Sequence, residues 1–158
     1  MASWQTAWKN AEDRIFGYFQ NILGGDLNKT AFIAEMPKDF EDQGEDGMWS
    51  FVMNGGGTPL DDGQNVATPG AWVEKQMDAE VRGVWNTRAR AMEMAGLLMD
   101  ALPIVEDSLD GIYRIIPRQE PRLERITIQR KADQDLGGEV RVWTMTYELA
   151  VIFKRTEV

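Results

Sequence analysis

Hydrophobic positions recur with helical spacing at the start of the chain. Residues 3–23 carry apolar side chains at steps of three and four, which places them on one face of a helix. Ser3 is a suitable N-cap, and Gly24 and Gly25 can adopt the left-handed conformation that ends a helix. We therefore expect an amphipathic helix here. Its apolar face comprises Trp4, Trp8, Ala11, Ile15, Tyr18, Phe19 and Ile22.

The next segments indicate two short strands and two long loops. The apolar run at residues 31–36 ends before Pro37 and predicts a strand, and residues 49–53 predict the strand that returns beside it. The acidic, turn-rich residues between them predict a mobile hairpin loop. A second loop spans residues 54–70, and a loop of that length without secondary structure usually has a function.

Residues 71–85 form the clearest strand pattern, because apolar and polar side chains alternate. One face of this strand should be buried and the other exposed to water. We expect the strand to project beyond the sheet or to bend at Gly83. The apolar positions are Val73, Met77, Ala79, Val81 and Trp85, and the polar ones are Glu74, Gln76, Asp78, Glu80 and Arg82.

A second helix is expected over residues 88–102, with a cap at Asn86 or Thr87 and a stop at Pro103. Its small residues should allow close approach to a sheet. Met92, Met94 and Met99 are interpreted as side chains that fill gaps in the core. The narrow apolar stripe consists of Ala91, Ala95, Leu98 and Leu102, broadened by Met94, Leu97 and Ala101.

The last third of the chain predicts strands at residues 111–116, 123–131 and 140–154. The turn-forming residues 132–138 predict that the last two strands pair antiparallel. The predicted fold is a single α+β domain over residues 1–158, mainly an antiparallel β-sheet with two helices packed on one face and a long loop-bearing hairpin. One face of the final strand carries Trp143, Met145, Tyr147, Leu149, Val151 and Phe153.

Composition changes the functional expectation, because the 158 residues include no cysteine and no histidine. The commonest general base, the commonest metal ligand and every thiol nucleophile are therefore missing. The segment Gly55–Thr58 continues into Pro59 instead of a phosphate-binding Gly-Lys-Ser/Thr turn, and the acidic run after Glu41 lacks the ligands of a calcium loop. We expect no catalytic residues, no cofactor and no metal, although carboxylate or lysine chemistry stays open.

The net charge of −9 argues against a nucleic-acid-binding surface, since such binding depends on lysine and arginine. Residues 1–79 contain 13 acids and 5 bases, whereas residues 80–158 contain 13 acids and 12 bases. This asymmetry fits either a solvated acidic surface or a molecule that stacks its acidic end on a partner. No apolar run approaches the ~20 residues of a membrane span.

Three stretches carry a resemblance to a known family. They are the passage from strand to helix at Val84-Trp85-Asn86-Thr87-Arg88-Ala89-Arg90-Ala91, the stop at Leu102-Pro103 before Gly111-Ile112-Tyr113, and the closing run Arg141-Val142-Trp143-Thr144-Met145-Thr146-Tyr147. In these residues the chain resembles the tail terminator (tail completion) proteins of long-tailed bacteriophages. The resemblance covers residues 71–154 well and the first half by element order, and the loops at 38–48 and 54–70 are longer than is usual for the family.

The resemblance implies a virion structural protein without catalytic residues. Such proteins form a ring, typically hexameric, on the last ring of the tail tube, where they stop polymerisation and meet the head connector. The implied partners are further copies of this chain, the tail tube protein and the connector or adaptor. DNA passes only as cargo, no membrane is involved, and the protein moves from the host cytoplasm to the virion neck. Two alternatives remain: another neck, head–tail joining or tail-tube protein, or a small-ligand-binding or enzymatic α+β domain that uses carboxylates.

Two groups of residues are candidates for contact with partners. The acidic group has either a solvated role or a place at the rim or lumen of a ring, where it would repel DNA phosphates. The basic stretch from Arg118 to Lys131 is either a solvated face or the surface that meets an acidic neighbour. The interface candidates are Trp4, Trp8, Trp72, Arg88, Arg90, Arg122 and Arg125. The acidic candidates are Asp39, Glu41, Asp42, Glu45 and Asp46.

Overall fold

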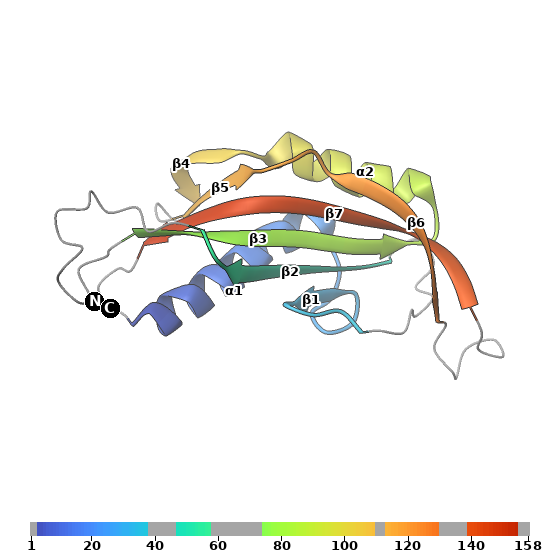
Figure 1. Cartoon of the computed structure of the whole chain (residues 1–158), viewed down its shortest axis with the longest axis horizontal. Helices are drawn as coiled ribbons and strands as arrows, with labels where there is room; N and C mark the ends of the chain where they lie inside the picture. Colours follow the sequence, from blue (N-terminus) through green and yellow to red (C-terminus); the bar gives the residue numbers. More distant parts are fainter. Residues whose placement is uncertain (1–2, 38–46, 58–73, 110–112, 130–138, 155–158) are drawn as a thin grey trace.

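A computed structural model describes residues 3–37, 47–57, 74–109, 113–129 and 139–154. Within these ranges two helices lie on one seven-stranded sheet (Figure 1). The elements in chain order are α1 (Trp4–Leu23), β1 (Ala31–Ile33), β2 (Met48–Gly55), β3 (Glu74–Trp85), α2 (Arg88–Ala101), β4 (Ile104–Leu109), β5 (Tyr113–Pro117), β6 (Arg122–Gln129) and β7 (Glu139–Lys154).

The sheet is built around the long antiparallel pair of β3 and β7. Its strand order is β1-β2-β3-β7-β5-β4, and β6 also pairs with β7. The first half of β7 pairs with β6 and the second half with β5, so both of these strands lie on the side of β7 away from β3. The expected antiparallel pairing of the last two strands is confirmed.

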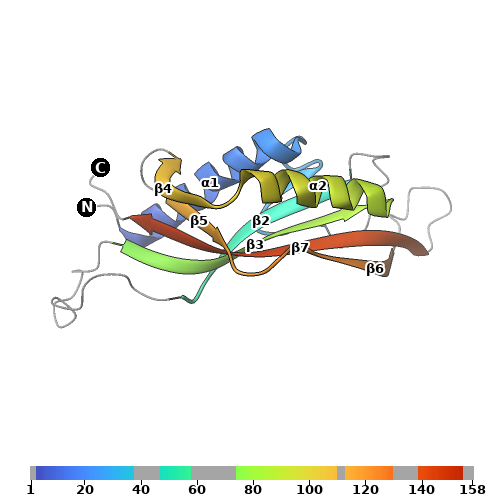
Figure 2. The ribbon, with the colours of Figure 1, turned by 90° about the horizontal axis from the view of Figure 1, so that it is seen from above.

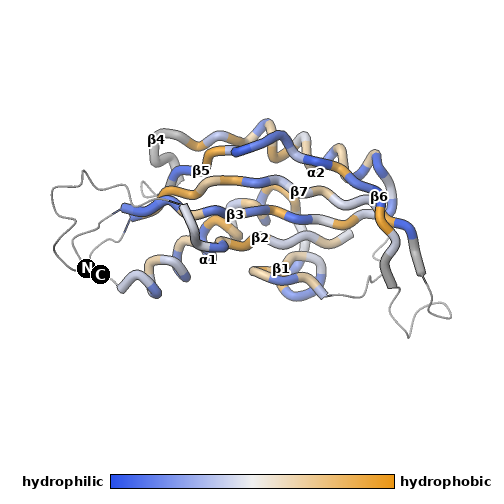
Figure 3. The backbone as a smooth tube through the Cα atoms, in the orientation of Figure 1, coloured by the Kyte–Doolittle hydropathy of each residue, from blue (hydrophilic) through white to orange (hydrophobic). Residues whose placement is uncertain are grey.

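Both helices lie on the same face of the sheet (Figure 2). The core between the layers contains Phe19 of α1, Leu98 of α2 and Leu149 of β7, all fully buried. Figure 3 shows hydrophobic positions interspersed with polar ones along the central strands, as expected for strands with one buried face. The predicted α+β fold, with two helices on one face of a mainly antiparallel sheet, is confirmed.

The helix boundaries follow the predicted capping chemistry. The hydroxyl of Ser3 accepts a hydrogen bond from the Thr6 N–H at 3.1 Å, and that of Thr87 accepts one from the Arg90 N–H at 3.2 Å. Gly24 ends α1 with φ of 78°, a conformation that favours glycine. α2 ends at Ala101, and Leu102 is already extended before Pro103.

The expected hairpin in the first half is wrong, because β1 and β2 pair in parallel. β1 stops at Ile33, where Ala34 adopts φ of 73° and donates its N–H to the Phe51 carbonyl at 2.8 Å. Two parallel neighbours cannot be joined by a tight hairpin turn. The proposed loop tip, residues 38–46, lies outside the described residues.

Two further expectations for the strands are corrected. From Glu74 to Trp85, β3 does not project from the sheet, because each of these residues pairs with β7 and the stretch from Asp78 to Val84 also pairs with β2. The segment β4, directly after α2, was not expected as a strand; its sequence Ile-Val-Glu-Asp-Ser-Leu lacks the regular alternation on which the strand predictions depend.

Candidate protein-binding site

The outer side of α2 exposes three large apolar side chains. Met92 is 48% exposed, Leu97 38% and Met99 44%, so the expectation that they pack in the core is wrong. Met94, at 3% exposure, does fill the core as expected. The small residues Ala91 and Ala95 are buried against the sheet, and the buried face of α2 is narrow. The large side chains on either side of this face therefore remain exposed.

Beside this helix runs a depression that we call the α2 groove. It lies between α2 and the segment that leads into β6, and its volume is about 710 Å³. A second depression of about 380 Å³ adjoins it and shares Met99, Gln119 and Glu120. Methionine side chains are flexible and polarisable, so they adapt to an apolar partner. The apolar lining consists of Met92, Ala95, Gly96, Met99, Pro121 and Leu123.

The charged rim of the α2 groove is mainly basic. Arg88 and Arg122 line it together with the single acid Glu120. The Arg88 guanidinium lies 5.8 Å from the ring centroid of Trp143, and its Nη1 is 3.0 Å from the Met92 sulfur. Neither arginine forms an ion pair with any residue that the structure describes. Their charge is thus available to an acidic group of a partner.

Three of the predicted interface arginines converge here. Arg88 begins α2, Arg122 begins β6, and Arg125 pairs across the sheet with Trp143, whose ring Arg88 approaches. The exposed side chains of Arg122 and Arg125 come from a strand that contacts α2. The fold therefore joins residues that are more than thirty positions apart in the chain.

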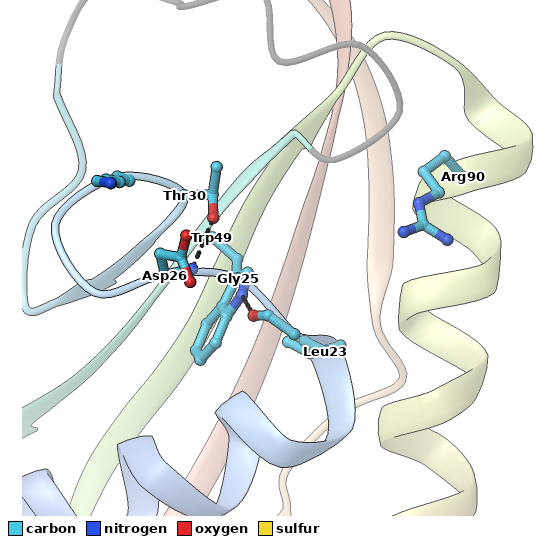
Figure 4. Close-up of a pocket in the computed structure, with 8 residues that line it drawn as sticks. Leu23, Gly25, Asp26, Thr30, Trp49 and Arg90 are labelled. Carbon is cyan, nitrogen blue, oxygen red and sulfur yellow. Dashed lines mark hydrogen bonds between the residues drawn. The ribbon is translucent and has the colours of Figure 1, made fainter.

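Arg90 lies elsewhere, on a separate polar pocket between the end of α1 and the start of α2 (Figure 4). This pocket has a volume of about 410 Å³ and is also lined by Asp26, Lys29, Thr30 and Trp49. The Arg90 side chain forms an ion pair of 2.9 Å with Glu93 on its own helix. The pocket can admit water or a polar side chain.

The two N-terminal tryptophans are half-buried and line a third depression of about 540 Å³. Trp4 packs edge-on against Phe153, with ring centroids 5.8 Å apart, and the Lys75 ammonium lies 4.2 Å from its ring centroid. Trp8 donates its indole N–H to the Met53 carbonyl at 3.2 Å. Both rings are thus partly packed against the core, and both also line the depression.

The remaining candidates cannot be placed. Trp72 and the acidic residues Asp39, Glu41, Asp42, Glu45 and Asp46 lie outside the described residues. The same holds for Arg130 and Lys131 of the basic stretch.

Many of the described residues are acidic. Among them, no group of three acidic side chains is close enough to hold a metal ion. Burial, and secondarily the charge of Glu120, raises the pKa of Tyr147 above its ordinary value. Neither of the two described helices is long and apolar enough to cross a membrane.

Sequence reasoning missed the apolar part of the site. Met92 and Met99 are seven residues apart, which is two helical turns, and both fall outside the stripe of Ala91, Ala95 and Leu98. A helix with apolar residues off its buried stripe exposes them, so this spacing was the available signal. The sequence matches no protein-family model, and no curated protein is significantly similar to it.

Proposed function

We propose that this protein is a virion structural protein of the tail-terminator type, which forms a ring at the head-proximal end of a phage tail tube. It stops polymerisation of the tube and joins the tail to the head connector. The observation that carries the proposal is the uncovered α2 groove. An apolar surface with a charged rim is characteristic of a protein–protein contact, and a lone domain gains nothing from leaving it exposed.

The order of elements supports the terminator type within this class. β3 runs into α2 with only Asn86 and Thr87 between them, and α2 ends at Ala101, directly before Leu102-Pro103. Two short strands, β4 and β5, and the antiparallel pair β6–β7 then follow. These are the elements that contain the three stretches on which the family resemblance rests.

The two edges of the sheet differ, and this difference favours a ring of copies over a two-fold symmetric dimer. The strand β1 closes one edge, whereas α2, β6 and β4 lie toward the other. A contact between unlike surfaces leaves one surface of each kind unused at the ends of the assembly. Such a contact closes only in a ring, or else continues as a filament.

The open face of the sheet supports a passive relation to DNA. Three arginines on this side of the sheet are engaged by neighbouring acids: Arg114 pairs with Glu74, Arg118 with Asp78 at 2.9 Å, and Arg82 with Glu80 at 3.0 Å. A cation that is already paired gains less from a phosphate, because the phosphate must compete with the carboxylate. This face therefore suits a channel through which DNA moves.

Tube assembly in the presence and absence of this protein tests the proposal. A tail tube protein from the same phage is polymerised alone, with this protein, and with a Met92→Asp variant, and tube lengths are measured by electron microscopy. The expected result is short capped tubes with the wild type and long tubes without it. Unrestricted lengths in all samples would contradict terminator function, and binding to the connector without an effect on length would favour another neck protein.

A further inference from the structure

A half-exposed leucine lies on a tight turn near the edge of the sheet that is opposite to the α2 groove. We call residues 24–30 the Leu27 turn, after Leu27, which is 49% exposed. The Asp26 carbonyl accepts hydrogen bonds from the N–H groups of Lys29, Thr30 and Ala31 at 3.0, 3.0 and 3.1 Å. Asn28 adopts φ of 65° and donates its N–H to the Ala31 carbonyl at 2.8 Å. The exposure of Leu27 therefore belongs to a well-defined backbone.

Side chains from other elements brace the same turn. Trp49 of β2 donates its indole N–H to the Gly24 carbonyl at 2.9 Å, and Gln20 of α1 donates its amide to the Gly25 carbonyl at 2.9 Å. Figure 4 shows the Trp49 ring beneath this turn. A leucine held outward on a braced turn loses little conformational entropy on binding, which favours contact with an apolar surface.

The Leu27 turn and the α2 groove lie at opposite edges of the sheet. The turn leads directly into the edge strand β1, and Leu27 forms a backbone bridge with Ala31. The groove is lined by α2 and by residues at the start of β6, on the far side of β7 from β1 (Figure 1). One molecule therefore cannot bring its own leucine to its own groove.

We propose that Leu27 of one copy inserts into the α2 groove of a second copy of this chain. The leucine would meet Met92, Met99 and Leu123, which are apolar and partly exposed. The contact itself follows from these surfaces. Its closure into a ring rests on the proposed function.

Charges beside the two surfaces are complementary. Asp26 precedes Leu27 and is exposed, and it forms no ion pair with any described residue, whereas Arg88 and Arg122 lie on the groove rim. Lys29 lies on the other side of Leu27, and the groove carries the acid Glu120. Opposite charges on both flanks of an apolar insertion fix its orientation and disfavour other partners.

Two variants that each disable one surface test the proposal. Leu27→Asp places a charge on the turn, and Met92→Asp places one in the groove; Ile116→Asp, at a β5 position that is 37% exposed, is the matched control. Oligomers are measured by sedimentation velocity. Wild type and control should assemble, and each variant alone should dissociate at least tenfold more readily.

A mixture of the two variants gives the decisive outcome. One intact groove and one intact turn remain, so a contact between unlike surfaces should produce dimers and nothing larger. Assembly of either variant at wild-type strength, or a mixture that stays monomeric, would overturn the proposal. Thermal unfolding of each variant checks that the exposed substitutions leave the fold intact.

The absence of cysteine from the chain allows a second test that also captures weak contacts. The double variant Leu27→Cys/Met92→Cys should form a ladder of disulfide-linked species on mild oxidation, and Leu27→Cys/Ile116→Cys should not, because a disulfide needs Cα atoms within roughly 7 Å. No ladder, or equal ladders, would overturn the contact. Tubes that are capped by both charged variants would overturn the contact and leave the proposed function intact, whereas a ladder without capping would overturn only the function.

Discussion

The Glu12 carboxylate of α1 accepts a hydrogen bond from the backbone N–H of Met53 in β2, at 2.9 Å. The Met53 carbonyl accepts one from the Trp8 indole at 3.2 Å. β1 pairs with β2 only as far as Phe51, so Met53 lies on the edge of β2 just beyond the end of β1. Two side chains of α1 thus take the place of a strand there, and they close an edge that could otherwise pair with another chain.

Glu12→Ala should destabilise the fold by about 1–2 kcal/mol, because the partly buried Met53 N–H loses an ionised acceptor. Asp13→Ala is the matched control, since Asp13 is exposed and its substitution should change the free energy of unfolding by less than about 0.5 kcal/mol. Urea denaturation measures both. Equal effects of the two substitutions would show that the edge contact contributes nothing.

Position 83 must be glycine because the ring of Trp85, two residues further along the same face of β3, covers it. A Cβ at Gly83 would lie 1.9 Å from the Trp85 Cη2, and the ring is fully buried and cannot move aside. Gly83→Ala should therefore cost about 1–3 kcal/mol through overpacking. The measurement is the midpoint of urea unfolding.

Gly17→Ala is the control, because it should change the free energy of unfolding in the opposite direction. Gly17 lies within α1, and a Cβ there would meet nothing within 4 Å. Alanine favours a helix over glycine, so this variant should be more stable by roughly 0.5–1 kcal/mol. A neutral Gly83→Ala beside a stabilising Gly17→Ala would mean that the Trp85 ring adjusts easily.

The sequence predicted elements where one period persists over many residues. The alternation in β3 and β7 and the caps at Ser3 and Thr87 are local properties, and the structure has them where expected. The direction of β1 relative to β2 is a tertiary property, and the short apolar runs of these strands do not indicate whether they pair in parallel or antiparallel. The contact between Glu12 and Met53 was invisible for the same reason.

The charged residues of the candidate site could be predicted from the sequence, whereas its exposed apolar residues could not. Arg122 and Arg125 belong to a basic stretch that was expected to meet an acidic neighbour, and Arg88 belongs to the expected passage from strand to helix. The fold gathers these three arginines around Trp143 and α2. Whether Met92 packs inside or lies outside depends on the rotation of α2 about its axis. That rotation is set by how closely Ala91 and Ala95 approach the sheet.

Leu98→Ala should cost about 2–5 kcal/mol, because this side chain is fully buried between α2 and the sheet and its loss leaves a cavity. Its neighbour Leu97 is 38% exposed, so Leu97→Ala should change stability by about 0.5 kcal/mol or less. Both substitutions have the same chemistry and the same helix propensity. A loss below about 1 kcal/mol for Leu98→Ala would show that α2 is rotated from its described position.

Tyr147 should make stability depend on pH in alkaline solution. Burial raises the pKa of its phenol above the usual 10.0, and the negative charge of Glu120 raises it further. Above the usual pKa the unfolded chain releases this proton, while the folded chain retains it until the higher pKa is reached. The folded state then binds more protons than the unfolded state, so the free energy of unfolding must fall as the pH rises across this window.

The stabilisation is therefore complete below about pH 10 and is lost as the pH rises towards the folded-state pKa. Tyr147→Phe removes the phenol and should flatten the decline in the free energy of unfolding as the pH rises above about 10, while Glu120→Gln should flatten it less because its charge is the smaller cause. Urea denaturation at a series of pH values measures the slopes, and Tyr18→Phe, which alters a half-buried tyrosine on α1, is the control. If the Tyr147→Phe variant loses stability with pH as steeply as the wild type, the phenol is not held neutral by the fold.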